Sequence, residues 1–139
     1  MLLNLKLFGS LFVIGLLVDF LWLGVIAKNF YLSQLGDLAR LGPDGNLDPI
    51  KWAAGLVYVF IVLGLVVFVL PKIQMSDTYV MALGWGFLFG LICYGVYDFT
   101  NYSTLAKYPL TLAMADVLWG AVLCGMLTGL GKYLRDVIF

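Results

Sequence analysis

The 139-residue sequence contains no histidine, only two cysteines, and few charged residues, which make up 12% of the chain. Without histidine the chain cannot form a bis-histidine haem site, a histidine–zinc site or a histidine proton relay. Cys93 and Cys124 lie in separate apolar runs and fit neither a Cys-x-x-Cys pair nor a zinc pattern. We therefore expect two small buried helix residues and no cofactor.

The few charges are also balanced, because the chain has eight acidic and eight basic side chains. A net charge of zero argues against a general nucleic-acid-binding protein. Soluble domains are about half apolar and about one quarter charged, whereas this chain is 63% hydrophobic. One small soluble core cannot hide so much apolar surface. The sequence therefore predicts a single integral-membrane domain, residues 1–139, with membrane lipids as its surroundings.

Four apolar stretches are long enough to cross a bilayer, which takes about 20 residues in an α-helix. They cover approximately residues 7–27, 52–70, 79–99 and 109–130. The first stretch is too long for a cleaved signal peptide and is interrupted by Asp19, so we interpret it as a retained span. Within the second, Tyr58 alone carries a polar side-chain atom, and we expect that helix to supply packing and lipid contact rather than chemistry.

The connection between the first two stretches is the only long one. Phe30, Leu35, Leu38 and Leu41 recur in it at helical spacing, which predicts a short helix lying in the membrane interface. The predicted fold is therefore an all-α membrane protein: a compact bundle of four transmembrane helices plus this interfacial helix. Basic residues are divided equally between the two sides, and the basic C-terminal tail slightly favours cytoplasmic termini.

Three carboxylates, Asp19, Asp98 and Asp116, lie within or at the end of these apolar stretches. A charged group inside hydrocarbon costs at least a few kcal/mol, so it usually faces protein or water. At about 1.5 Å per residue, Asp19 lies roughly 12 Å and Asp116 roughly 10 Å below the same surface. Asp98 is expected in the last turn of the third helix, on that side too. The three can share one pocket if their helices are neighbours.

Aromatic and amide side chains accompany the carboxylates at helical spacing. An Asp-x-Leu-Trp sequence occurs twice, on helices that run in opposite directions, which indicates either an inverted pseudo-symmetry or chance. Two Gly-x-x-x-Gly pairs, one on each of the last two helices, favour close backbone approach. The expected pocket residues are Asp19, Trp22, Tyr94, Asp98, Asn101, Asp116 and Trp119.

Simpler structural roles compete with this pocket. Asp98 could anchor a helix end in the headgroup region, and each of Asp19 and Asp116 could be a protonated group that bonds a backbone carbonyl. We favour transport or permeation of a proton, a cation or a small polar solute through a homo-oligomer, because four helices enclose little volume. The alternatives are a membrane enzyme acting on a lipid or isoprenoid, and a non-catalytic lipid- or ligand-binding or accessory subunit. No catalytic residue stands out, and a metal ligand set is left open.

The polar segment 97–120 resembles the signature of DUF2177, a family of small bacterial membrane proteins. Its members carry Tyr-Asp-Leu-Thr-Asn-x-x-Thr-Leu, then Trp-Pro, then Asp-x-x-Trp-Gly. The matching positions are Tyr97, Asp98, Thr100, Asn101, Thr104, Leu105, Pro109, Asp116, Trp119 and Gly120, together with Asp19, Trp22 and Gly24 in the first helix. Phe99 replaces Leu and Tyr108 replaces Trp. The resemblance covers essentially the whole chain and implies four transmembrane helices in the bacterial inner membrane, but no activity.

Overall fold

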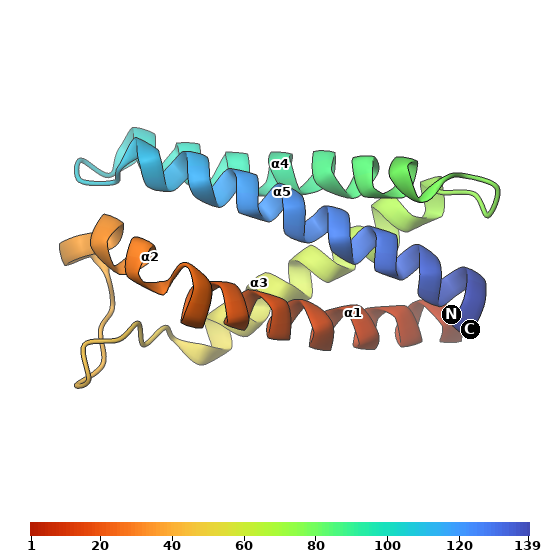
Figure 1. Cartoon of the computed structure of the whole chain (residues 1–139), viewed down its shortest axis with the longest axis horizontal. Helices are drawn as coiled ribbons and strands as arrows, with labels where there is room; N and C mark the ends of the chain where they lie inside the picture. The colour runs from red at the N-terminus through yellow and green to blue at the C-terminus, as the bar shows by residue number, and fades with distance from the viewer.

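Four long helical segments lie alongside one another in the computed structural model, which describes residues 1–139 (Figure 1). The first is α1 (Leu2–Leu21), continued by η1 (Trp22–Ile26). The second is α3 (Lys51–Gly64), continued by η3 (Leu65–Val69) and η4 (Leu70–Lys72). The third is α4 (Tyr79–Thr104), and the fourth is α5 (Leu110–Tyr133), continued by η5 (Leu134–Ile138). All four are long and apolar enough to span a bilayer, which confirms the predicted fold class.

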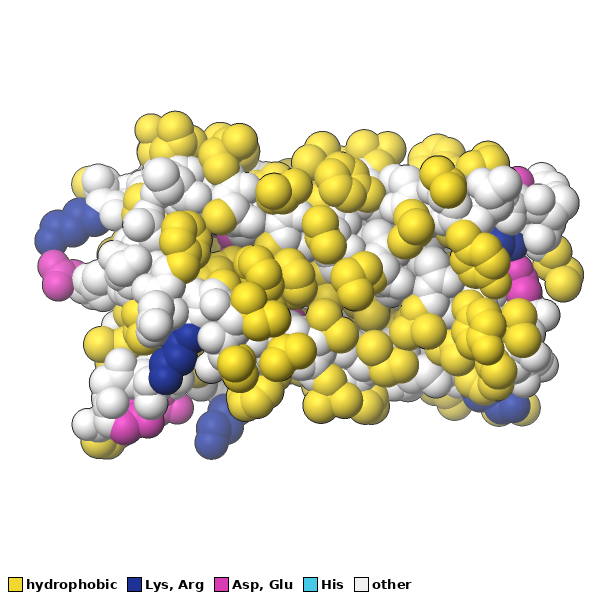
Figure 2. All heavy atoms as spheres, in the orientation of Figure 1, with side chains coloured by type: hydrophobic (Ala, Val, Ile, Leu, Met, Phe, Trp, Pro, Cys, Tyr) yellow, Lys and Arg dark blue, Asp and Glu magenta, His cyan; other side chains and the backbone are white.

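The surface of the bundle is that of a membrane protein. Apolar side chains cover its middle, whereas the charged side chains gather towards the two ends (Figure 2). Both termini lie at the same end, as four alternating spans require (Figure 1). The helices extend beyond their predicted ends, because polar residues at a membrane surface can continue a helix that hydropathy alone would stop. Consequently Asp98 lies inside α4, a full turn and more before its end at Thr104.

The predicted interfacial helix is present as α2 (Lys28–Leu35), followed by the single turn η2 (Gly36–Leu38). It lies against the end of the bundle where α5 begins. Two contacts fasten it there: Thr111 donates a hydrogen bond to Gln34, and Lys107 forms a 3.1 Å ion pair with Asp37. This short helix therefore covers the start of the fourth span.

Helices α4 and α5 form the tightest pair of the bundle. Two glycines of α4, Gly86 and Gly90, lie directly on the backbone of α5, so a Cβ atom at Gly86 would meet Cys124 and Thr128. A Cβ atom at Gly90 would meet the carbonyl oxygen of Gly120. Close approach through small residues is the usual way to pack helices in lipid, where apolar burial gives no preference for a protein partner.

The half of the bundle near the termini is packed with apolar side chains. Leucine and valine side chains from α1, η3 and α5 meet there in a continuous apolar core. Among its members Leu11, Val62, Leu65 and Leu123 are 0% exposed. This half of the membrane-spanning region is therefore closed by close-packed hydrocarbon.

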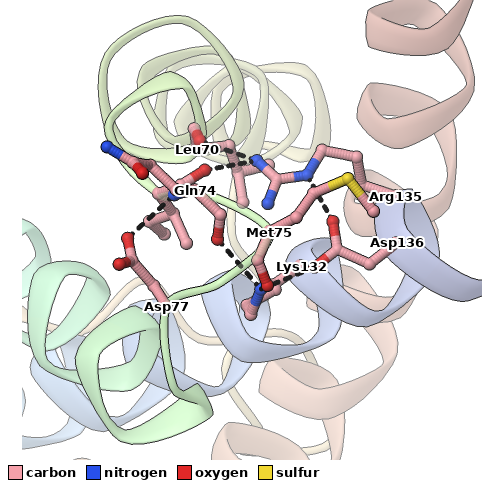
Figure 3. A network of polar contacts seen from close by, with 8 residues as sticks. Leu70, Gln74, Met75, Asp77, Lys132, Arg135 and Asp136 are labelled. Atoms are coloured by element: carbon pink, nitrogen blue, oxygen red, sulfur yellow. Dashed lines mark hydrogen bonds and ion pairs between the residues drawn. The ribbon is translucent and has the colours of Figure 1, made fainter.

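At the outer edge of that core, Lys132 is buried to 2% exposure and secures the end of the second span (Figure 3). Its ammonium group donates to the carbonyl oxygens of Gln74 and Met75, both at 3.1 Å, and to Asp136 at 2.6 Å. The last carbonyl groups of a helix and its exit loop lack intrahelical partners. A buried cation supplies them with donors, an arrangement that no sequence pattern predicted.

Arg135 adds to the same arrangement one turn further along (Figure 3). Its guanidinium donates to the carbonyl oxygens of Leu70 at 3.0 Å and Ile73 at 2.8 Å, and to Asp136 at 2.7 Å. Positive charge at a helix C-terminus is favoured by the helix dipole. We call Lys132, Arg135 and Asp136 the terminal clamp; it joins the end of the fourth span to that of the second.

Candidate functional site

A cavity of about 480 Å³ lies in the other half of the bundle, among α1, α3, α4 and α5. Ten of its twelve lining residues are hydrophobic. Two carboxylates, Asp19 from α1 and Asp116 from α5, also line it. The cavity is thus an apolar hollow with acidic groups on its wall.

Asp19 is 4% exposed and is held by two neutral donors. The indole nitrogen Nε1 of Trp119 donates to its Oδ1 at 2.6 Å, and the hydroxyl of Tyr58 donates to its Oδ2. Both oxygens of the carboxyl group therefore have a hydrogen-bond partner. These contacts join α1 to α3 and to α5 through a single side chain.

Asp116 is bound from the interfacial helix. The hydroxyl of Tyr31 on α2 donates to its Oδ1 at 2.5 Å. Burial, and next the negative charge of Asp116, raise the pKa of the Tyr31 hydroxyl above its ordinary value. Tyr31 therefore keeps its proton and remains a donor, which holds α2 over the end of α5.

The two Asp-x-Leu-Trp sequences meet across the bundle. The rings of Trp22 and Trp119 stack with centroids 4.1 Å apart and planes 7° from parallel. Trp119 bonds the aspartate of the other repeat, Asp19, directly. Trp22 reaches Asp116 through Tyr31, whose hydroxyl oxygen accepts from the indole nitrogen at 3.4 Å. Each tryptophan is thus linked to the aspartate of the other repeat: Trp119 to Asp19 directly, and Trp22 to Asp116 through Tyr31.

Asp98 lies behind the cavity wall rather than in it. Its carboxyl group is 0% exposed and its Oδ1 accepts from the hydroxyl of Tyr108 at 2.6 Å. Its Oδ2 is buried without a hydrogen-bond partner, and the carboxyl of Asp116 lies nearby.

The cavity opens sideways, towards the lipid. Val57, Phe60 and Tyr97 line it, yet all three are strongly exposed; Phe60 reaches 66%. The second span crosses the bundle obliquely, so that α4 packs on its later turn η3 rather than along α3 (Figure 1). The opening lies where α3 and α4 diverge.

The structure brings most of the predicted pocket residues together. Asp19, Tyr94, Asp116 and Trp119 line the cavity. Trp22 and Asp98 lie immediately behind that wall, in contact with lining residues. Asn101 does not join them: it lies beyond Asp98 near the end of α4, and its side chain makes no hydrogen bond.

Three tyrosines of this site were not predicted. The helix that carries Tyr58 was expected to supply packing and lipid contact rather than chemistry; in the structure its Tyr58 hydroxyl bonds Asp19 and the helix forms one wall of the cavity. Its isolation as the one polar group in that span was the available signal. Tyr31 and Tyr108 lie in connecting segments, and only the folded chain brings them to Asp116 and Asp98.

The fold and the acidic cavity define a polytopic membrane protein with four helical spans. A family model described as "Predicted membrane protein (DUF2177)" matches residues 4–133, and the chain belongs to that family. No curated protein and no solved structure matches the chain.

Proposed function

We propose that this protein binds an amphipathic molecule that enters from the bilayer. The apolar part of the ligand would occupy the cavity, and its polar head would reach Asp19 and Asp116. The observation that carries the proposal is the asymmetry of the cavity: its wall is apolar and open to lipid, whereas Asp19 is buried and Asp116 is half-buried at its polar end.

The size and composition of the cavity support a small-molecule ligand. Binding sites for such ligands usually measure about 300–1,000 Å³ and combine an apolar lining with a few polar groups that orient the ligand. The cavity measures about 480 Å³ and its polar lining atoms are few. A molecule dissolved in the membrane can enter between α3 and α4 without crossing a polar surface.

The packing of the half of the bundle near the termini favours ligand binding over passage of a solute through one protomer. Beyond the cavity lie the apolar core around Leu11 and Leu65 and then the terminal clamp. No carboxylate continues the row into that core; the buried polar side chain there, Thr128, donates to the carbonyl oxygen of Cys124 on its own helix. Transport through a homo-oligomer and action as an enzyme on a lipid or isoprenoid remain predictions from the sequence.

We place the protein in the bacterial inner membrane with cytoplasmic termini. The family description supports a membrane location. Four basic residues lie at each end of the bundle, so their number alone gives no preference under the positive-inside rule. The proposed orientation rests on the basic C-terminal tail that holds Lys132 and Arg135.

Photolabelling tests the binding proposal. The protein is reconstituted in lipid nanodiscs with three probes that share a twelve-carbon chain and a diazirine and end in an amine, an alcohol or a carboxylate. After irradiation, peptide mass spectrometry locates the adducts. We expect at least one probe to label segments 54–61 and 93–97 preferentially.

Two matched variants give this test its control. Val57 and Val67 lie on the same span and are 50% and 47% exposed, but only Val57 lines the cavity. Val57→Trp should abolish the preferential labelling of segment 93–97, whereas Val67→Trp should preserve it. Adducts spread evenly over all lipid-facing surfaces, with no effect of Val57→Trp, would disprove the proposed binding site.

A further inference from the structure

We infer that the ligand of this cavity carries a cationic amine head. The inference rests on the proposed function and names the ligand class of the same site. It is argued from the charges around the cavity, from the donors that hold its carboxylates, and from the apolar shape of the remaining wall.

The cavity carries acidic groups without any basic partner. The ion pairs of the protein are Lys107–Asp37, Lys132–Asp136 and Arg135–Asp136, and none of them involves Asp19, Asp98 or Asp116. The hydrogen-bond partners of these three carboxyls are tyrosine and tryptophan. The polar end of the cavity is therefore short of positive charge.

Protein groups occupy both oxygens of Asp19, and none of them carries a positive charge. An indole N–H can only donate, so the Oδ1 atom facing Trp119 must be an acceptor. Tyr58 occupies the other oxygen. An anion buried in hydrocarbon remains costly even when neutral donors surround it. A cation in the adjoining cavity would offset that cost.

A second observation points the same way. The Oδ2 atom of the fully buried Asp98 has no donor, and neighbouring Asp116, which lines the cavity, accepts one hydrogen bond, from Tyr31. A protonated amine offers up to three N–H donors, so a cationic head in the cavity can donate to Asp116.

The remaining wall selects against a bare inorganic cation and favours an alkylammonium. Ten of the twelve lining residues are hydrophobic, so an ion brought from water would lose its hydration shell for few oxygen ligands. Aromatic rings of Tyr94, Tyr97 and Trp119 are part of the lining. Their faces attract ammonium groups, and the apolar wall accepts an alkyl chain.

The ranking of the three probes tests this inference at pH 7. A primary amine is then protonated, as lysine is, and the fatty acid is ionised. We expect the amine probe to label the cavity at a concentration at least about tenfold lower than the alcohol, the gain typical of a charge-assisted hydrogen bond. The carboxylate probe should label it least, because it meets like charge.

Charge-removing variants provide the matched comparison. Asp19→Asn and Asp116→Asn should each reduce the preference for amine over alcohol, whereas Asp37→Asn should retain it. Asp37 is a solvent-exposed carboxylate remote from the cavity, paired with Lys107. Circular dichroism checks that each variant is folded. If Asp19→Asn unfolds, the probe ranking in the wild type and the amine preference of Asp116→Asn decide whether the inference holds.

The outcomes separate the two proposals. Equal labelling by amine and alcohol, or stronger labelling by the carboxylate, overturns the cationic head group while leaving the cavity a binding site. If none of the three probes labels the cavity segments preferentially, the proposed function fails as well. Amine preference that survives both Asp19→Asn and Asp116→Asn also overturns the inference.

Discussion

The side chains that satisfy the buried carboxylates of this protein are aromatic. Tyr58 and Trp119 bond Asp19, and Tyr31 bonds Asp116. Tyrosine and tryptophan combine a large apolar body with one polar atom, so they can sit in a membrane and still donate a hydrogen bond. They orient an aspartate without neutralising it, which leaves charge available to a ligand.

At the residue scale, Gly90 is decisive for packing. A Cβ atom there would meet the carbonyl oxygen of Gly120 and would lie 2.8 Å from the Cα atom of Ala121. Backbone cannot move aside as a flexible side chain can. We predict that Gly90→Ala destabilises the protein by about 1–3 kcal/mol, the usual cost of overpacking, measured by thermal unfolding in detergent.

Gly84 provides the control on the same helix. It is exposed, and a Cβ atom there would meet nothing within 4 Å. Gly84→Ala should therefore change stability by no more than about 0.5 kcal/mol. Equal destabilisation by the two substitutions would contradict the assignment of Gly90 to the interface between α4 and α5.

At the scale of elements, α2 covers the polar end of the site. Its eight residues are too few to be stable as an isolated helix. Tertiary contacts must hold it, and the bond from Tyr31 to Asp116 is the one that ties it to the cavity. The stacked pair of Trp22 and Trp119 lies directly beneath.

We predict that Tyr31→Phe loosens α2. Loss of a hydrogen bond to a charged group typically costs about 1.5–3 kcal/mol, so the amides of residues 28–35 should exchange with deuterium at least about tenfold faster. Hydrogen-exchange mass spectrometry in nanodiscs measures this. Tyr102→Phe is the matched control, since Tyr102 is exposed and its hydroxyl makes no hydrogen bond. Unchanged exchange in Tyr31→Phe would mean that other contacts hold α2.

At the scale of the whole molecule, the bundle has two unlike halves. One contains the acidic cavity and its lateral opening, and the other contains the apolar core and the terminal clamp. Such a division suits a site that exchanges its ligand with one leaflet. It does not suit a continuous aqueous path within a single protomer.

Reconstituted vesicles should therefore show no proton flux above that of empty vesicles when a pH gradient is imposed. A pH-sensitive dye inside the vesicles follows the flux, and gramicidin verifies that a leak would be detected. Flux in the wild type that disappears in both Asp19→Asn and Asp116→Asn, but persists in Asp37→Asn, would restore transport through an oligomer as the better explanation.

The sequence by itself determined the number of spans, their helical form and the shared depth of Asp19 and Asp116. Hydrophobic length specifies a span, and the fixed rise of a helix specifies depth. A short helix after the first span was also predicted, but two of the four spaced residues, Leu38 and Leu41, lie outside α2, which ends at Leu35. Because the rise of a helix is fixed, the two Asp-x-Leu-Trp sequences could be placed at matching heights before their contact was known.

Only the tertiary structure decided which helix faces meet. In lipid, the side of a helix that contacts protein is as apolar as the side that contacts acyl chains, so periodicity cannot tell them apart. Tyr58 therefore could not be placed against Asp19, nor the lateral opening between α3 and α4 foreseen. The terminal clamp could not be predicted for a related reason: burial of Lys132 depends on carbonyl groups some 58 positions away in the chain.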